Sequence, residues 1–98
     1  MEVIGKQVLT SFIRRHANSK NQISTWLGLV ESKNWENINQ VKESFSSKVS
    51  VLKNDRAIFN VKGNSYRIVA RLDFNRKVVK IQFVGTHAEY DKIDANTV

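Results

Sequence analysis

The residues of this sequence best suited to proton transfer lie near its C-terminal end. Thr86 and Glu89 have the T-x-x-E spacing of a capping box, which predicts a short helix that begins at His87. His87 and Tyr90 then lie one turn apart on one face, and each can donate or accept a proton. A plainer interpretation stays open, in which the box only caps the helix, His87 is exposed and Tyr90 packs with its hydroxyl satisfied.

The other histidine has a different setting. His16 ends a predicted helix, where a cation suits the helix dipole, so we expect a structural role for it. With two distant histidines and no cysteine, we expect no metal site.

A second group of candidates consists of polar and basic residues in the second half of the chain. The net charge of +7 arises entirely in residues 48–80, which contain nine basic and two acidic residues. Such a segment favours a polyanion or an acidic protein as partner, with nucleic acid the leading interpretation. The residues expected on one surface, as a phosphate cradle or simply as solvated charges, are Asn60, Lys62, Arg67, Arg71, Lys80 and Gln82.

Three predicted strands position these residues. Residues 57–62, 65–74 and 77–85 are rich in β-branched and aromatic residues and alternate with period two. Two-residue loops at Gly63-Asn64 and Asn75-Arg76 predict the pairs Phe59 with Ile68, Asn60 with Arg67, Leu72 with Val79, Ala70 with Ile81, Ile68 with Phe83, and Arg71 with Lys80. The core face then carries Phe59, Val61, Tyr66, Ile68, Ala70, Leu72, Val79, Ile81 and Phe83.

The first half of the chain predicts helices. Apolar residues recur at helical spacing in residues 6–16, 23–30 and 35–45, and Ser19 with Gln22 has the spacing of a capping box before the second helix. Trp26 and Trp35 belong to these stripes and are expected in the core. The predicted fold is one α+β domain over residues 1–98, with N-terminal helices on one face of a mainly antiparallel sheet and a short C-terminal helix. Residues 2–4 are a candidate edge strand.

Composition excludes several function classes. The chain has 98 residues, no proline and no cysteine, which is the length of one domain without disulfides. No apolar stretch approaches the length of a bilayer span and no signal peptide is evident, so we expect a cytoplasmic protein without a membrane partner. The phosphate-binding and hydrolase motifs G-x-G-x-x-G, P-loop and G-x-S-x-G are missing, and no small-molecule cofactor is expected.

Two longer segments carry family motifs. Residues 54–68 read N-D-R-A-I-F-N-V-K-G-N-S-Y-R-I and residues 83–94 read F-V-G-T-H-A-E-Y-D-K-I-D. Together they closely resemble the HigB family of bacterial toxins in the RelE superfamily, most specifically in F-N-V-x-G-N-x-Y-R and T-H-x-E-Y-D. The first half resembles the family more loosely, through Trp26, Trp35 and residues 39–45. The resemblance implies the RelE-like fold, whose concave sheet face holds RNA.

The resemblance also implies an activity. A type II toxin of this kind is an endoribonuclease that cuts mRNA on the translating ribosome without a metal: a base deprotonates the ribose 2′-hydroxyl, the oxygen attacks the adjacent phosphate, and an acid protonates the leaving 5′-oxygen. By this likeness His87 transfers a proton, Tyr90 orients the ribose or phosphate or shares that transfer, and Arg67 holds the scissile phosphate; which group is the base stays open. The further RNA-binding candidates are Arg56, Asn60, Lys62, Asn64, Arg71 and Lys80.

The implied partners are mRNA on the ribosome and a helix-turn-helix antitoxin of the HigA type. Two other functions fit the same residues. A toxin of this fold can act without catalysis by binding a protein target such as gyrase, in which case the basic surface meets an acidic one. A nontoxic RNA-binding module would also have the observed charge.

Overall fold

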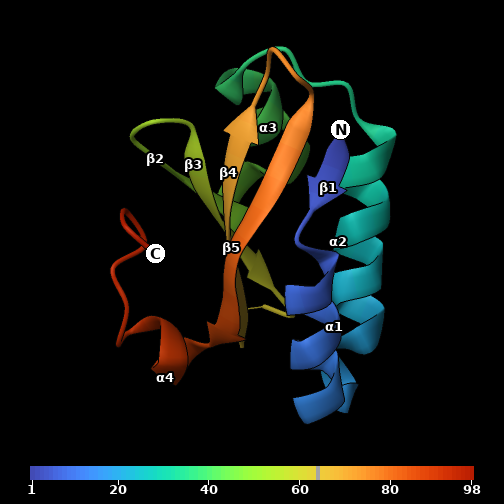
Figure 1. Ribbon diagram of the computed structural model, residues 1–98, viewed down its shortest axis with the longest axis vertical. Helices are drawn as coiled ribbons and strands as arrows, with labels where there is room; N and C mark the ends of the chain where they lie inside the picture. The colour runs from blue at the N-terminus through green and yellow to red at the C-terminus, as the bar shows by residue number, and fades with distance from the viewer. Residues whose placement is uncertain (64) are drawn as a thin grey trace.

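The computed structural model describes residues 1–63 and 65–98 and has the predicted α+β architecture. Helices α1 (Lys6–Arg15) and α2 (Lys20–Ser32) lie side by side on one face of the sheet, and the C-terminal part of the chain lies on the other (Figure 1). The elements in chain order are β1 (Glu2–Ile4), α1 (Lys6–Arg15), the 3-10 turn η1 (Ala17–Ser19), α2 (Lys20–Ser32), α3 (Ile38–Phe45), the 3-10 turn η2 (Ser46–Lys48), β2 (Val49–Leu52), β3 (Arg56–Val61), β4 (Tyr66–Asp73), β5 (Val78–Thr86) and α4 (His87–Tyr90).

The sheet is mixed, with strand order β1-β5-β4-β3-β2. The predicted edge strand is confirmed as β1, which pairs parallel to β5, whereas the other neighbouring strands are antiparallel. Strand β2 was not predicted. It joins β3 through Asn54 and Asp55, whose φ angles of 60° and 57° are those of a type I′ hairpin turn.

The predicted register holds for β3 and β4, including Asn60 opposite Arg67. Between β4 and β5 it holds only as far as Ala70 opposite Ile81, because a bulge follows and Gln82 has no partner on β4. Beyond the bulge Ile68 lies opposite Val84, so the predicted pairing of Ile68 with Phe83 is wrong. Because one extra residue exchanges the two faces of a strand, Val84 enters the main core and Phe83 turns to the opposite face.

The main core lies between the sheet and the helices. Phe12 of α1 and Phe59 of β3 are fully buried, and the ring of Trp26 meets that of Phe59 edge to face with centroids 5.2 Å apart. Trp35 is buried too, as predicted, although it precedes α3, which begins only at Ile38 with Asn37 as its N-cap.

The ends of the first two helices differ from the prediction. Helix α1 ends at Arg15, and His16 caps it while its ring stacks on Phe12 at a centroid distance of 4.4 Å. The capping box of Ser19 and Gln22 does not form, because the Ser19 hydroxyl donates to the main-chain oxygen of His16 at 2.6 Å. The preceding turn η1 therefore takes the hydroxyl that would otherwise cap α2.

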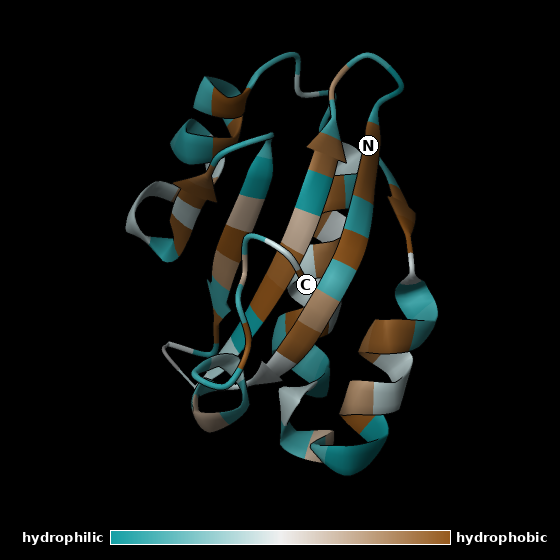
Figure 2. Cartoon of the chain, turned by 60° about the vertical axis from the view of Figure 1, so that its left-hand side comes forward, coloured by the Kyte–Doolittle hydropathy of each residue, from teal (hydrophilic) through white to brown (hydrophobic). Residues whose placement is uncertain are grey.

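A smaller cluster covers the middle of the other sheet face. Its buried residues are Ile58, Val69 and Ala95, with the side chains of Phe83 and Ile93 packed against them. The C-terminal segment, residues 91–98, crosses this face in front of the strands (Figure 2). The second face of the sheet was expected to be polar and basic throughout. That expectation is wrong for the middle of this face, which is apolar. No helix in the described residues is long and apolar enough to cross a membrane.

Candidate RNA-binding site

The site begins where β5 turns into α4. The predicted capping box forms: the Thr86 hydroxyl accepts from the main-chain N–H of Glu89 at 3.2 Å, and the Glu89 carboxylate accepts from that of Thr86 at 2.9 Å. The main-chain N–H of His87 donates to the oxygen of Ser65 at 3.2 Å. These bonds fix the start of α4 beside the first residues of β4.

The capping box also sets the charge state of Glu89. The main-chain N–H of Thr86 that donates to its carboxylate, helped by the Thr86 hydroxyl and by the nearby Arg15, holds the pKa of Glu89 below its usual 4.5. Glu89 is therefore ionised at neutral pH, where it stabilises the N-terminus of α4.

A pH dependence of stability follows from this lowered pKa. The carboxylate stabilises the folded state fully above about pH 4.5, and this contribution is lost as the pH falls through the lower pKa of the folded state. Because the Glu89 side chain is 41% exposed, we expect less than about 1 kcal/mol. Urea unfolding at neutral pH and at about pH 3 measures it. Glu89→Gln, which keeps an acceptor but cannot titrate, should approach the wild type at the lower pH; a constant gap between the two would contradict this.

Arg67 and Tyr90 meet directly. The guanidinium carbon of Arg67 lies 4.8 Å from the centre of the Tyr90 ring, within the range of a cation–π contact. Arg67 makes no ion pair in the described part of the chain, and its Nε is buried without a hydrogen-bond partner. Its neighbour Asn60 on β3 likewise has a buried side-chain oxygen, Oδ1, for which the described residues provide no hydrogen-bond donor. The stack thus orients a cation whose guanidinium makes no hydrogen bond to the residues that the structure describes.

His87 lies one turn before Tyr90 on α4 and is exposed. Its Nδ1 is 3.0 Å from a carboxylate oxygen of Asp91, so the imidazole has one nitrogen engaged and the other, Nε2, left for a ligand. The structure therefore brings the three residues predicted for catalysis to one place. We name Arg67, His87 and Tyr90, together with Asn60, the α4 cluster.

Gly85 is a part of this site that the sequence analysis missed. It lies opposite Arg67 in the register, and a Cβ added to it would be only 2.5 Å from Cζ of Phe83 and 3.1 Å from Cβ of Glu89. The missing side chain thus makes room for the Phe83 ring beside the start of α4. The sequence does contain a signal for this arrangement: the successive apolar residues Phe83 and Val84 break the alternation of β5 and indicate a bulge beside Gly85.

Gly85→Ala is expected to destabilise the fold by about 1–3 kcal/mol, because the new methyl group forces the packed Phe83 ring to move. The matched control is Gly28→Ala in α2, where a Cβ meets nothing within 4 Å, and there we expect a gain of about 0.5–1 kcal/mol. Denaturant midpoints of both variants measure the effects. If the Gly85→Ala and Gly28→Ala variants had equal denaturant midpoints, the Phe83 ring would move aside without a loss of stability.

The remaining cations form a second group on the same face. Arg56, Arg71 and Lys80 lie side by side across three strands. Arg71 is four residues from Arg67 along β4, a separation of about 13 Å, and the apolar row of Ile58, Val69 and Phe83 lies between them.

The members of this second group are not all free. Arg56 Nη1 donates to the main-chain oxygens of Ala95 at 3.1 Å and Val98 at 2.9 Å, which ties the C-terminal segment to the sheet. Arg71 and Lys80 are exposed and line a groove of about 600 Å³ that also contains Asp55 and Asp73. Asp73 pairs with Arg76, which also lines this groove, whereas Arg67 makes no ion pair with any described residue.

Two further candidates are placed differently. Lys62 was expected on the face of Arg67, but its Nζ lies 5.9 Å from the centre of the Tyr66 ring, and Tyr66 packs toward the helices and donates to Asn18. That prediction is wrong, because Lys62 follows the end of β3 with a φ of 55° and leaves the strand alternation. Asn64 lies outside the described residues.

No group of three or more His, Cys, Asp or Glu side chains suited to hold a metal ion occurs within residues 1–63 and 65–98. Comparison with known proteins adds the family. A model of the HigB toxin, described as the RelE-like toxic component of a toxin-antitoxin system, matches residues 19–93. No curated protein matches the chain.

Proposed function

Since the chain belongs to the HigB toxin family, the RelE-like toxic components of toxin-antitoxin systems, we propose that it is an endoribonuclease that cuts mRNA on the translating ribosome. The observation that carries the proposal is the α4 cluster, in which an exposed histidine, a tyrosine and an arginine that pairs with no carboxylate of the described residues lie together. A protein that only binds an acidic surface has no need of proton-transfer groups beside its cations.

The proposed reaction needs two proton transfers and one charge-stabilising group. The 2′-hydroxyl loses its proton to a base, its oxygen forms a bond to the adjacent phosphorus, and the bond to the 5′-oxygen breaks. Protonation of that oxygen leaves a 2′,3′-cyclic phosphate and a 5′-hydroxyl end. We assign proton transfer to His87 and the orientation of the ribose or phosphate, or a share in that transfer, to Tyr90.

Arg67 has the electrostatic role in this scheme. The phosphorane gains negative charge as it forms, and a guanidinium already held in place by the Tyr90 ring stabilises this charge without reorganising. Arg71 and Lys80 are proposed to contact RNA farther along the strand, on the other side of the C-terminal segment.

The test of this function is cleavage of one message in two states. Primer extension should find cuts in an mRNA that is being translated in a purified system and hardly any in the same mRNA without ribosomes. Cuts in both states at equal rate would contradict dependence on the ribosome. An intact message together with growth arrest would contradict the nuclease and favour a toxin that binds a protein target.

A further inference from the structure

The side chains of α2, the end of α3, η2 and the end of β3 line an open groove of about 580 Å³, which meets the α4 cluster only at Asn60. Its floor is apolar, formed by Trp26, Leu29, Phe45 and Val61. Its rim carries Lys48 and Lys62, and no carboxylate lines it among the residues that the structure describes. The groove is therefore apolar inside and positive at its edge.

Three buried side-chain atoms of residues that line this groove have no hydrogen-bond partner among the described residues: Trp26 Nε1, Gln22 Oε1 and Asn60 Oδ1. The indole Nε1 of Trp26 donates to nothing although the side chain is only 5% exposed, and the amide oxygen of Gln22 accepts from nothing. Trp35, by contrast, donates its indole N–H to the Ser44 hydroxyl at 3.0 Å. Since a buried donor without a partner is costly, the Trp26 N–H points to a group that is supplied from outside.

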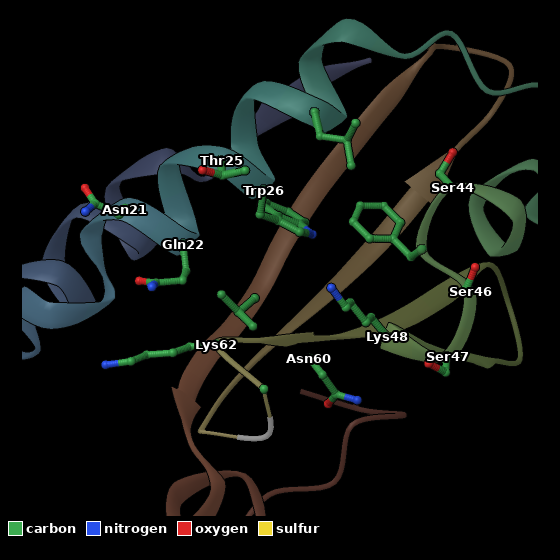
Figure 3. Close-up of a pocket in the computed structure, with 14 residues that line it drawn as sticks. Asn21, Gln22, Thr25, Trp26, Ser44, Ser46, Ser47, Lys48, Asn60 and Lys62 are labelled. Atoms are coloured by element: carbon green, nitrogen blue, oxygen red, sulfur yellow. The ribbon is translucent and has the colours of Figure 1, made fainter.

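The lining indicates what that group is. Figure 3 shows the Trp26 indole and the Lys48 side chain directed toward each other from α2 and η2. An acceptor between them would receive the indole N–H and meet a cation, which suits a carboxylate. The apolar floor beside it suits an aliphatic or aromatic side chain of the same partner.

RNA fits this groove less well than a protein does. The Trp26 ring is buried edge to face against Phe59, so its face is closed to a stacking base. The arginines of the sheet, which would follow a phosphate backbone, lie on the opposite face.

We propose that the groove between α2 and η2 docks the antitoxin, through a segment that presents a carboxylate to Lys48 and the Trp26 N–H and an apolar side chain to the floor. The inference rests on membership in a toxin-antitoxin family and not on the cleavage chemistry. Asn60 is the one residue of the α4 cluster that lines the groove, and Arg67, His87 and Tyr90 do not line it, so the antitoxin can bind there without occupying these three residues.

The first test uses the indole resonances of the toxin labelled with ¹⁵N at its two tryptophans, titrated with the full-length cognate antitoxin. The Trp26 indole resonance should move, while that of Trp35, already bonded to Ser44, serves as the internal control. Trp35→Phe assigns the two signals. A Trp26 resonance that stays in place, as when a water alone satisfies it, overturns the proposal, and so does one that responds to a short RNA and not to the antitoxin.

The second test measures the Kd of the antitoxin by calorimetry. Lys48→Glu and the groove-filling Thr25→Phe should each weaken binding by about tenfold or more. The control Lys42→Glu, an exposed lysine on α3 outside the groove, should stay within about twofold. Wild-type affinity in both groove variants overturns the proposal. A toxin that binds through the groove yet leaves translated mRNA intact would overturn the nuclease function and leave this inference standing.

Discussion

Replacing His87 with alanine is expected to slow the cleavage of translated mRNA by about 10²–10⁴-fold, the usual loss when a positioned proton-transfer group is removed. The side chain is exposed, and its Nδ1 is engaged by Asp91, the residue that caps the C-terminus of α4. The substitution therefore removes chemistry and leaves the fold intact. Quantitative primer extension on one message, under single-turnover conditions, measures the loss.

The matched control is the only other histidine, His16. Its ring stacks on Phe12 at the end of α1, so His16→Ala should lower stability while the folded variant keeps wild-type cleavage. Tyr90→Phe separates two roles within the α4 cluster: it keeps the ring on which Arg67 stacks and removes only the hydroxyl. Undiminished cleavage by His87→Ala would refute the assignment of proton transfer to this residue.

Arg67→Ala is the second substitution with a large expected effect, a loss of about 10²–10³-fold in the cleavage rate, as for the removal of one donor that stabilises a transition state. Arg67→Lys should recover only a small part of this activity. Lysine keeps the charge but lacks the planar guanidinium that stacks on Tyr90. The same primer extension assay measures both variants.

Arg14→Ala is the control for this series, because it removes an exposed arginine of α1 and the same unit of charge. If Arg14→Ala and Arg67→Ala slowed cleavage equally, the effect would belong to the net charge of +7 and not to the site. If only Arg67→Ala slowed cleavage, the effect would instead belong to the position of this guanidinium in the site.

The division of the cations into two groups bears on how the proposed RNA substrate would bind. A strand held at Arg67 reaches Arg71 and Lys80 only by passing over the C-terminal segment, which Arg56 and the apolar row hold against the sheet. The segment thus forms part of the surface that RNA would meet. Strand alternation alone predicted one continuous basic surface, whereas the structure has two separate groups of cations on this face.

Much of the site was predictable because its determinants are close in the sequence. The capping box of Thr86 and Glu89 depends on residues three apart, and it places His87 and Tyr90 on one turn in any fold that contains this helix. The hairpin register that sets Arg67 beside Asn60 follows from one loop and from period-two alternation. Local geometry dictates such features before any long-range contact forms. The adjacent turn residues Asn54 and Asp55 are a comparable local signal for the hairpin of β2 and β3.

Other features were decided only by packing between distant parts of the chain. The bulge at Gln82 turns Phe83 to the second face, where Ile58, Val69 and the space beside Gly85 receive it. Arg56 binds main-chain oxygens 39 and 42 residues away, which no local pattern encodes. The same holds for the unpaired Trp26 N–H: spacing correctly predicted a buried indole, but whether its nitrogen finds a partner depends on which side chains α3, η2 and β3 bring beside it. The sequence alone thus determined which residue types occur and which face of a helix or strand each one takes. The tertiary structure decided which of these side chains stay free to meet a partner, because the hydrogen bonds of a side chain depend on all its neighbours at once.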